Sequence, residues 1–289
     1  MTATELELAY LHCQQMTRSQ AKNFYYAFRT LPPQKRRAIY AAYAFCRVCD
    51  DIADEPNTID EKRRLLSETK AKLNGMGSGG STDPVFIALA DACLSFNIPI
   101  AYLHEVVDGV EMDLVTTRYR TFEELWEYCY KVASVVGLIS IEIFGYKGEA
   151  ARERAIDLGI AMQLTNILRD LKEDAARDRI YLPQEDMVRA GYTEGDLKRG
   201  VTNDAYRELM RHQVERARGF FSNGRKLLPM VSPRSRACPT LLYTVYSRIL
   251  DRIESSGYDV FEQRIGLSKR EKMVMMARLW AASYLPVKA

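Results

Sequence analysis

The sequence predicts an all-α fold. Apolar residues recur with a helical period along almost the whole chain, in segments long enough for helices of about ten to twenty residues. Strand signals are scarce, because no run of alternating β-branched residues is bounded by turn dipeptides. The 289 residues, of which 47% are hydrophobic, are sufficient for a substantial core.

The expected helices have recognisable boundaries. Pro32 and Pro33 suit the opening turn of the third helix, and Pro99 and Pro183 mark similar starts, because a first helical turn needs no N–H from these positions. The segment 74–84, rich in glycine and serine, is the one obvious loop. We expect helices near residues 5–19, 22–29, 33–54, 59–74, 83–96, 99–114, 121–144, 148–173, 183–189, 202–227, 232–256 and 268–282.

Polar side chains form a stripe along each of two predicted helices. At about 100° per residue, spacings of three and four residues keep side chains on one helix face. The two stripes consist of Tyr43, Arg47, Asp50 and Asp54, and of Gln163, Asn166, Asp170 and Asp174. Carboxylates on two such faces can hold divalent cations between them, which is an arrangement for handling phosphate groups. Since one site needs both helices, we expect a single domain over residues 1–289.

The spacing alone is weak evidence, because a short motif also arises by accident. Three pairs show it: Asp50/Asp54, Asp170/Asp174 and Asp174/Asp178. The simplest alternative is that both stripes are solvated faces of surface helices. The neighbours Tyr40, Phe45 and Val48 argue against this for the first helix, since they leave little of its surface suited to water.

Composition excludes several classes of function. The net charge is +3 and the basic residues are scattered among acids, so a nucleic-acid partner is not indicated. The beginning of the chain lacks the basic and apolar regions of a signal peptide, and the apolar stretch 132–144 is too short to span a bilayer. We expect a cytoplasmic protein with no obligate protein partner, and peripheral contact with a membrane surface stays open.

Two further features have ordinary explanations. Cys46 and Cys49 form a Cys-x-x-Cys inside a continuous helical pattern, and no second pair or nearby histidine completes a zinc or redox site. Ala133, Gly137 and Ser140 line one face of the 121–144 helix. Such small residues let helices approach closely or leave room for an apolar ligand, and both interpretations stay open.

The motifs resemble those of the squalene and phytoene synthases, which join two prenyl diphosphates head to head. The resemblance rests on residues 43–55, 128–137 and 163–183, with further matches at 22–28, 246–254 and Arg264, and extends over about residues 19–270. It implies a bundle of antiparallel helices around a central apolar cavity, the isoprenoid synthase type of fold. It also implies a prenyl diphosphate as substrate.

The resemblance implies roles for individual residues. The magnesium ligands would be Asp50, Asp54, Asp170 and Asp174, with Mn²⁺ as an alternative metal. The diphosphates would be contacted by Arg47, Arg169 and Arg264, and steadied by Tyr43, Tyr246 and Asn23, although the family often has serine at position 23. Gln163 and Asn166 would be polar companions of the metals or the reacting carbons.

The chemistry explains why these residue types are needed. Breaking a carbon–diphosphate bond creates an allylic cation and an anionic leaving group, and the 2,3 double bond of a second prenyl chain attacks the cation before proton loss closes a cyclopropane. The aromatic residues Phe24, Phe28 and Tyr130 would stabilise the cation, each by up to about 2 kcal/mol, although each also suits an ordinary core position. The base is left open between released diphosphate and Tyr181.

The substrate and the class of enzyme have alternatives. Farnesyl diphosphate, giving presqualene diphosphate or squalene, is slightly favoured over geranylgeranyl diphosphate, giving phytoene, and a need for NADPH is open. Asp50-Asp51-x-x-Asp54 also suits a chain-elongating transferase or a terpene cyclase, but the second acidic segment favours the head-to-head enzymes. A non-catalytic helical adaptor is the third possibility, and the complete set of acids and arginines disfavours it.

Overall fold

The computed structural model of the chain describes residues 2–21, 24–76, 81–262, 265–268, 270–271 and 273–275. These residues form helices and no β-strand, with two isolated bridges, Arg118 to Ile180 and Tyr146 to Val231. The α-helices are α1 (Ala3–Gln20), α2 (Phe24–Phe28), α3 (Pro33–Asp54), α4 (Ile59–Gly75), α5 (Pro84–Phe96), α6 (Ile100–Met112), α7 (Phe122–Cys129), α8 (Val135–Phe144), α9 (Ala150–Arg169), α10 (Leu171–Ala176), α11 (Gln184–Ala190), α12 (Glu194–Lys198), α13 (Asp204–Gly224) and α14 (Ala237–Ser255). A π-helical turn, Tyr130–Ser134, joins α7 to α8, and a 3-10 helix, Arg225–Met230, follows α13. The predicted all-α fold is confirmed.

The helix starts follow the local chemistry of the sequence. Pro33 opens α3 directly after Pro32, while Pro99 and Pro183 immediately precede α6 and α11, as predicted. At the start of α7 the Thr121 side chain accepts a hydrogen bond from a first-turn backbone N–H, which satisfies a group that the helix leaves unpaired.

The predicted helix 148–173 is wrong in one important respect, because it bends at Asp170. This residue has φ −102° and ψ 17°, and it separates α9 from α10. Its carboxylate pairs with the guanidinium of the preceding residue, Arg169. The backbone hydrogen bonds continue on both sides, from the Asp170 N–H to Asn166 and from the Asp174 N–H to Asp170, both at 2.9 Å. The second acidic motif therefore spans the end of α9 and the start of α10.

Other boundaries also differ from the expectation. The predicted helix 121–144 contains the π-helical turn, and the predicted helix 202–227 changes to a 3-10 helix after Gly224. The last long helix begins at Ala237 instead of 232, since a turn containing Pro233 precedes it. Helix α12 was not predicted, because five residues are too few to show a period. The predicted helix 268–282 falls mostly outside the described residues.

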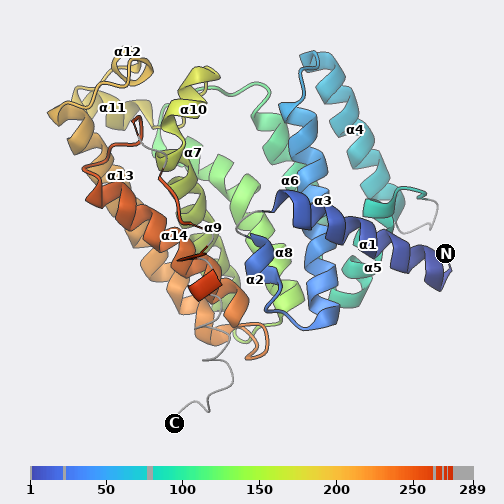
Figure 1. Cartoon of the computed structure of the whole chain (residues 1–289). Coiled ribbons are helices and arrows are strands. Elements are labelled where there is room, and N and C mark those ends of the chain that lie inside the picture. Colours follow the sequence, from blue (N-terminus) through green and yellow to red (C-terminus); the bar gives the residue numbers. More distant parts are fainter. Residues whose placement is uncertain are drawn as a thin grey trace, which may run out of the picture.

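The arrangement of the helices brings both acidic motifs to one end of the bundle. Helix α3 packs with α1 and α5 on one side, while α9 packs with α8, α13 and α14 on the other. Figure 1 shows that the carboxyl-terminal ends of α3 and α6 lie at the upper end, together with α10. The segment 113–121 crosses this end from α6 to α7.

The small residues predicted in the 121–144 segment serve helix packing. A Cβ atom at Gly137 would lie 3.2 Å from the carbonyl oxygen of Ala155 on α9. Facing the same segment, a Cβ at Gly159 of α9 would lie only 2.5 Å from the Cα of Ser134. Two helices thus approach almost to backbone contact. Within the described part of the chain, no helix combines the length and the apolar character that crossing a bilayer requires.

Candidate active site

The end of α3 carries the acidic side chains of Asp50 and Asp54. Burial, with help from the Asp54 carboxylate and against the Arg47 charge, raises the pKa of Asp50 to about 7, although part of this side chain is exposed. Arg47 forms an ion pair with Asp51 one turn along the helix, and its buried Nε has no hydrogen-bond partner among the described residues.

The second acidic face is built by α9 and α10. Arg169 Nε donates to Asp170 Oδ1 at 2.7 Å, and only 21% of the Arg169 side chain is exposed. Burial, together with the Asp170 charge, raises the pKa of Asp174 to about 7. One turn earlier, Asn166 Nδ2 donates to Gln163 Oε1 at 3.3 Å. The predicted stripe is therefore continuous across the bend, from the two amides to the two acids.

Asp113, the residue after α6, connects the two faces electrostatically. Burial raises its pKa, and the Asp54 carboxylate of α3 raises it further. The Asp113 charge in turn contributes to the raised pKa values of Asp50 on α3 and Asp174 on α10. Charge–charge interactions weaken with distance and with intervening water. One carboxylate that acts on both faces therefore indicates that the ends of α3 and α10 lie near each other.

Arg179 supplies a positive charge at the same place. Its Nη2 donates to the main-chain oxygen of Asp113 at 3.4 Å. Burial opposes the charge of this guanidinium, but the carboxylates of Asp113 and, more weakly, Asp54 outweigh that effect and raise its pKa. A positive charge thus lies beside the residue that links the two acidic faces electrostatically.

Three tyrosines support the Asp113 carboxylate. Tyr181 donates its hydroxyl to Oδ1 at 2.9 Å, and Tyr128 donates to Oδ2 at 3.2 Å. Tyr119 packs against both rings, with centroid distances of 5.5 Å to Tyr128 and 5.8 Å to Tyr181. Burial raises the pKa of each phenol, so the three hydroxyls stay neutral, and those of Tyr128 and Tyr181 act as donors.

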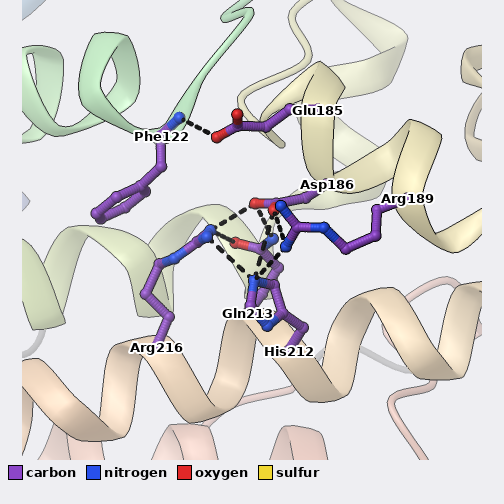
Figure 2. A network of polar contacts seen from close by, with 7 residues as sticks. All are labelled: Phe122, Glu185, Asp186, Arg189, His212, Gln213 and Arg216. Carbon is purple, nitrogen blue, oxygen red and sulfur yellow. Dashed lines mark hydrogen bonds and ion pairs between the residues drawn. The ribbon is translucent and has the colours of Figure 1, made fainter.

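Helix α11, which follows the segment with the last of these tyrosines, is firmly anchored (Figure 2). Asp186 is buried and accepts hydrogen bonds from Gln213 at 2.8 Å and Arg216 at 2.6 Å, both on α13. Next to it, Glu185 accepts the backbone N–H of Phe122 at 2.8 Å. These contacts connect α11 to both α7 and α13, and so fix its place in the bundle.

A cluster of aromatic side chains joins α2, α3 and α14. The ring centroid of Phe24 lies 6.0 Å from that of Phe28, 6.3 Å from that of Tyr43 and 6.2 Å from that of Tyr246. Tyr246 also shares a side-chain hydrogen bond with Asn166 of the second acidic face. Four of the residues selected from the sequence thus lie together, in contact with the polar stripe of α9.

Other selected residues are not part of this cluster. Tyr130 stacks on Trp126 with a centroid distance of 5.5 Å and forms a side-chain hydrogen bond with Glu105. Its neighbours therefore come from α6 and α7. Asn23 and Arg264 lie outside the described residues.

The sequence analysis missed three residues that the structure places where the two acidic faces approach each other. Tyr128 and Arg179 lie within the segments that carry the family resemblance, but neither falls on a polar stripe. Asp113 lies one residue beyond the end of α6 and belongs to neither polar stripe. Only its contacts with residues far away in the sequence reveal its place.

The carboxylates present fit a metal that is coordinated partly by the protein and partly by phosphate oxygens. Among the described residues, no three His, Cys, Asp or Glu side chains come together as a self-contained metal site. Magnesium does not need one, because it commonly binds one or two carboxylates and completes its octahedron with water and phosphate oxygens. Paired carboxylates on facing helix ends suit such shared coordination.

The helical bundle with acidic helix ends above an aromatic cluster is that of an isoprenoid synthase. A solved dehydrosqualene synthase, in complex with a ligand, superposes with a TM-score of 0.88 and 28% identity, over 96% of this chain and 98% of that one. The chain belongs to the squalene/phytoene synthase family, whose model matches residues 17–271. It is therefore a prenyltransferase that condenses two prenyl diphosphates head to head.

Two curated relatives match almost the whole chain. The 15-cis-phytoene synthase of Synechocystis sp. is 38% identical over 287 residues, which cover 95% of this chain and 85% of the relative. Phytoene synthase 2, chloroplastic, of Solanum lycopersicum is 37% identical over 290 residues, which cover 98% and 94%.

Proposed function

We propose that the enzyme condenses two molecules of geranylgeranyl diphosphate to phytoene. The observation that carries this proposal is the similarity along nearly the full length to proteins named phytoene synthases. It favours the geranylgeranyl alternative over the farnesyl substrate that the sequence alone slightly favoured. Head-to-head condensation is common to both substrates, so the correction concerns the length of the prenyl chain and not the type of reaction.

The two acidic faces are proposed to bind Mg²⁺ through Asp50 and Asp54 on α3 and through Asp170 and Asp174 after the bend of α9. Bound divalent ions neutralise diphosphate and make it a better leaving group. The pKa values of Asp50 and Asp174, raised chiefly by burial and further by neighbouring carboxylates, support this assignment, because a bound cation would offset both effects.

Arginines are proposed to hold the diphosphates. Arg47 and Arg169 already lie beside carboxylates of the two faces, and the buried Nε of Arg47 has no hydrogen-bond partner among the described residues. A guanidinium fork matches two phosphate oxygens at once, so it can orient the leaving group as well as neutralise it. Arg179, between the faces, is proposed to contribute to the same positive field.

The aromatic cluster is proposed to protect the carbocation. The faces of Phe24, Phe28, Tyr43 and Tyr246 offer negative charge density without a nucleophilic atom. Because their rings pack together, they also restrict the entry of water, which would otherwise trap the cation as an alcohol. The reaction then proceeds by attack of the second prenyl double bond.

Asp113 is proposed as the final acceptor of the proton lost on ring closure. A neutral Tyr181 is a weak base, but it can accept a proton on its oxygen while it passes its own hydrogen to Asp113 Oδ1, 2.9 Å away. Burial raises the pKa of Asp113, which makes its carboxylate a stronger base than an ordinary aspartate. The tyrosine left open by the sequence thus gains a defined partner.

Departure of the second diphosphate, opening of the cyclopropane and loss of a second proton leave a central double bond, so phytoene formation requires no reductant. Squalene formation would require delivery of a hydride at this step. We therefore expect turnover without NADPH.

The test is incubation of the purified enzyme with Mg²⁺ and either geranylgeranyl or farnesyl diphosphate, with and without NADPH, followed by chromatography of the hydrocarbons. The expected result is phytoene from geranylgeranyl diphosphate, at a rate that NADPH does not change. Turnover of farnesyl diphosphate alone, to squalene or dehydrosqualene, would refute the proposed substrate.

A further inference from the structure

The third Asp-x-x-x-Asp pair of the sequence is divided, because Asp174 belongs to the second acidic face and Asp178 belongs to neither face. Asp178 lies beyond the end of α10, and 68% of its side chain is exposed. Lys198 Nζ donates to its Oδ1 at 2.7 Å, and Arg118 Nη2 donates to the same oxygen at 2.9 Å. These hydrogen bonds, that of Lys198 first, hold the pKa of this carboxyl at about 2. Asp174 and Asp178 are therefore in different environments.

The backbone of Asp178 ends α10 in an unusual way. Its φ is 57°, in the left-handed region where glycine is common and where aspartate and asparagine are the most tolerated other residues. The turn is closed by the Asp178 N–H bonded to Ala175 O at 3.1 Å and by the Arg179 N–H bonded to Asp174 O at 2.9 Å. The direction in which Arg179 leaves the helix thus depends on this single left-handed residue.

Arg118 fixes the same turn through its guanidinium group. Besides the Asp178 carboxylate, it reaches the main-chain oxygens of Asp178 at 2.6 Å and Thr117 at 2.8 Å, and its Nε donates to Glu194 at 3.0 Å. The Ile180 N–H donates to Thr117 O at 3.0 Å. Three segments, 113–121, 177–181 and α12, are thereby joined.

This clasp, defined by Arg118, Asp178 and Lys198, lies next to the residues that connect the acidic faces. Arg118 is five residues after Asp113 on the same crossing segment, and Arg179 immediately follows Asp178. We propose that Asp178 is a positioning residue and not a metal ligand: the clasp fixes the turn that directs Arg179 toward Asp113, between the two acidic faces. The proposal rests on the proposed role of those faces in binding the metal and diphosphates.

The test compares Asp178→Asn with Asp178→Gly. Asparagine tolerates the left-handed backbone and its amide oxygen accepts hydrogen bonds, so we expect kcat within about threefold of the wild type. Glycine tolerates the backbone but removes the acceptor, so we expect a loss of about tenfold in kcat. The half-saturating Mg²⁺ concentration should stay within about twofold in both variants, because no ligand is removed. Asp204→Asn, at a fully exposed ion pair on α13, is the matched control and should have no effect.

Two outcomes would overturn the proposal. A metal ligand would lose activity equally in both Asp178 variants, with a raised Mg²⁺ requirement. A purely structural residue would leave kcat of the folded glycine variant at the wild-type level and lower only its melting temperature.

Coupling to Arg118 provides a second readout. Arg118→Gln in the Asp178→Gly background should add little to the loss, because both changes break the same clasp, whereas full additivity would contradict it. If the glycine variant does not fold, Lys198→Gln and Arg118→Lys replace it, and unchanged kcat in both would equally refute the proposal.

Asp174→Asn, measured in parallel, tests the metal assignment separately. Full activity of that variant would reject the proposed metal ligands, while the coupling between Asp178 and Arg118 would still decide the clasp.

Discussion

Replacing Asp113 by asparagine removes the charge between the two acidic faces while it keeps the size of the side chain. Two hydroxyl donors, Tyr181 at 2.9 Å and Tyr128 at 3.2 Å, end on this carboxylate. If Asp113 accepts the proton through Tyr181, the variant loses a general base. Such groups typically contribute about 10²–10⁴-fold. We therefore expect kcat to fall at least about 100-fold, which corresponds to about 2.7 kcal/mol of activation free energy.

The stability of the same variant should behave differently. The pKa of Asp113 is raised in the folded protein, chiefly by burial, so ionisation of this group lowers the free energy of unfolding as the pH rises from the unfolded pKa through the folded one. A neutral asparagine avoids this cost. We expect the free energy of unfolding in urea at pH 8 to stay within about 1 kcal/mol of the wild type, or to increase.

The assay measures phytoene formation from geranylgeranyl diphosphate alongside urea unfolding. Asp108→Asn is the control on the same helix, because this aspartate forms only a partly exposed ion pair with Lys70 at 2.7 Å, of a kind that contributes about 0–1 kcal/mol. A kcat of the Asp113 variant within threefold of the wild type would refute the proton-acceptor role. If the Asp113 variant also loses much of its stability, the lower kcat would instead reflect impaired folding.

Three other predictions can be tested with the same assays. Arg47→Lys should lower kcat/KM for the prenyl diphosphate by about tenfold or more, because an ammonium group cannot reproduce the bidentate fork; unchanged kinetics would argue against direct contact. The pKa values of Asp50 and Asp174, raised to about 7 by burial, mean that both carboxyls become protonated as the pH falls below 7. The half-saturating Mg²⁺ concentration should therefore be clearly higher at pH 6 than at pH 8, and equal values would contradict the assignment. Gly159→Ala would place Cβ 2.5 Å from facing backbone and should cost about 1–3 kcal/mol or more in urea unfolding, whereas Gly219→Ala, with open space around it, should be neutral or stabilising.

The sequence predicts the helices well because each long helix carries its own period. Helix α3 occupies the predicted range 33–54, and its stripe from Tyr43 to Asp54 runs along one face. The bend at Asp170 was not predictable from periodicity, because the residues on both sides keep the helical spacing. It depends on one backbone conformation and on a side-chain pair with Arg169.

The assignment of Tyr130 illustrates a second limit. A regular helix over 121–144 has a fixed phase, but the π-helical turn that begins at Tyr130 inserts a wider turn and shifts the faces that follow. Tyr130 stacks on Trp126, while Tyr128, two residues earlier, reaches Asp113. Two residues apart on a helix, at about 200°, the two tyrosines point to different sides, and only the packing of the helix decides which of them meets Asp113.

Asp113 and Arg179 show what no local pattern reveals. They are 66 residues apart, and their contact depends on the crossing segment 113–121 running alongside residues 178–181. Substrate length is determined in the same non-local way, since the depth of an apolar pocket depends on side chains from several helices. For this reason the proposed chain length relies on relatives and not on the motifs.

The central claim is that the ends of α3 and of α9–α10 together hold divalent cations and diphosphate. The most direct test is a crystal structure grown with Mn²⁺ and a thio analogue of geranylgeranyl diphosphate, with anomalous scattering recorded at the manganese edge. We expect anomalous peaks about 2.1 Å from carboxylate oxygens of both faces, with the analogue's phosphate oxygens completing the coordination. Manganese bound elsewhere, or diphosphate located away from Asp50, Asp54, Asp170 and Asp174, would contradict the account.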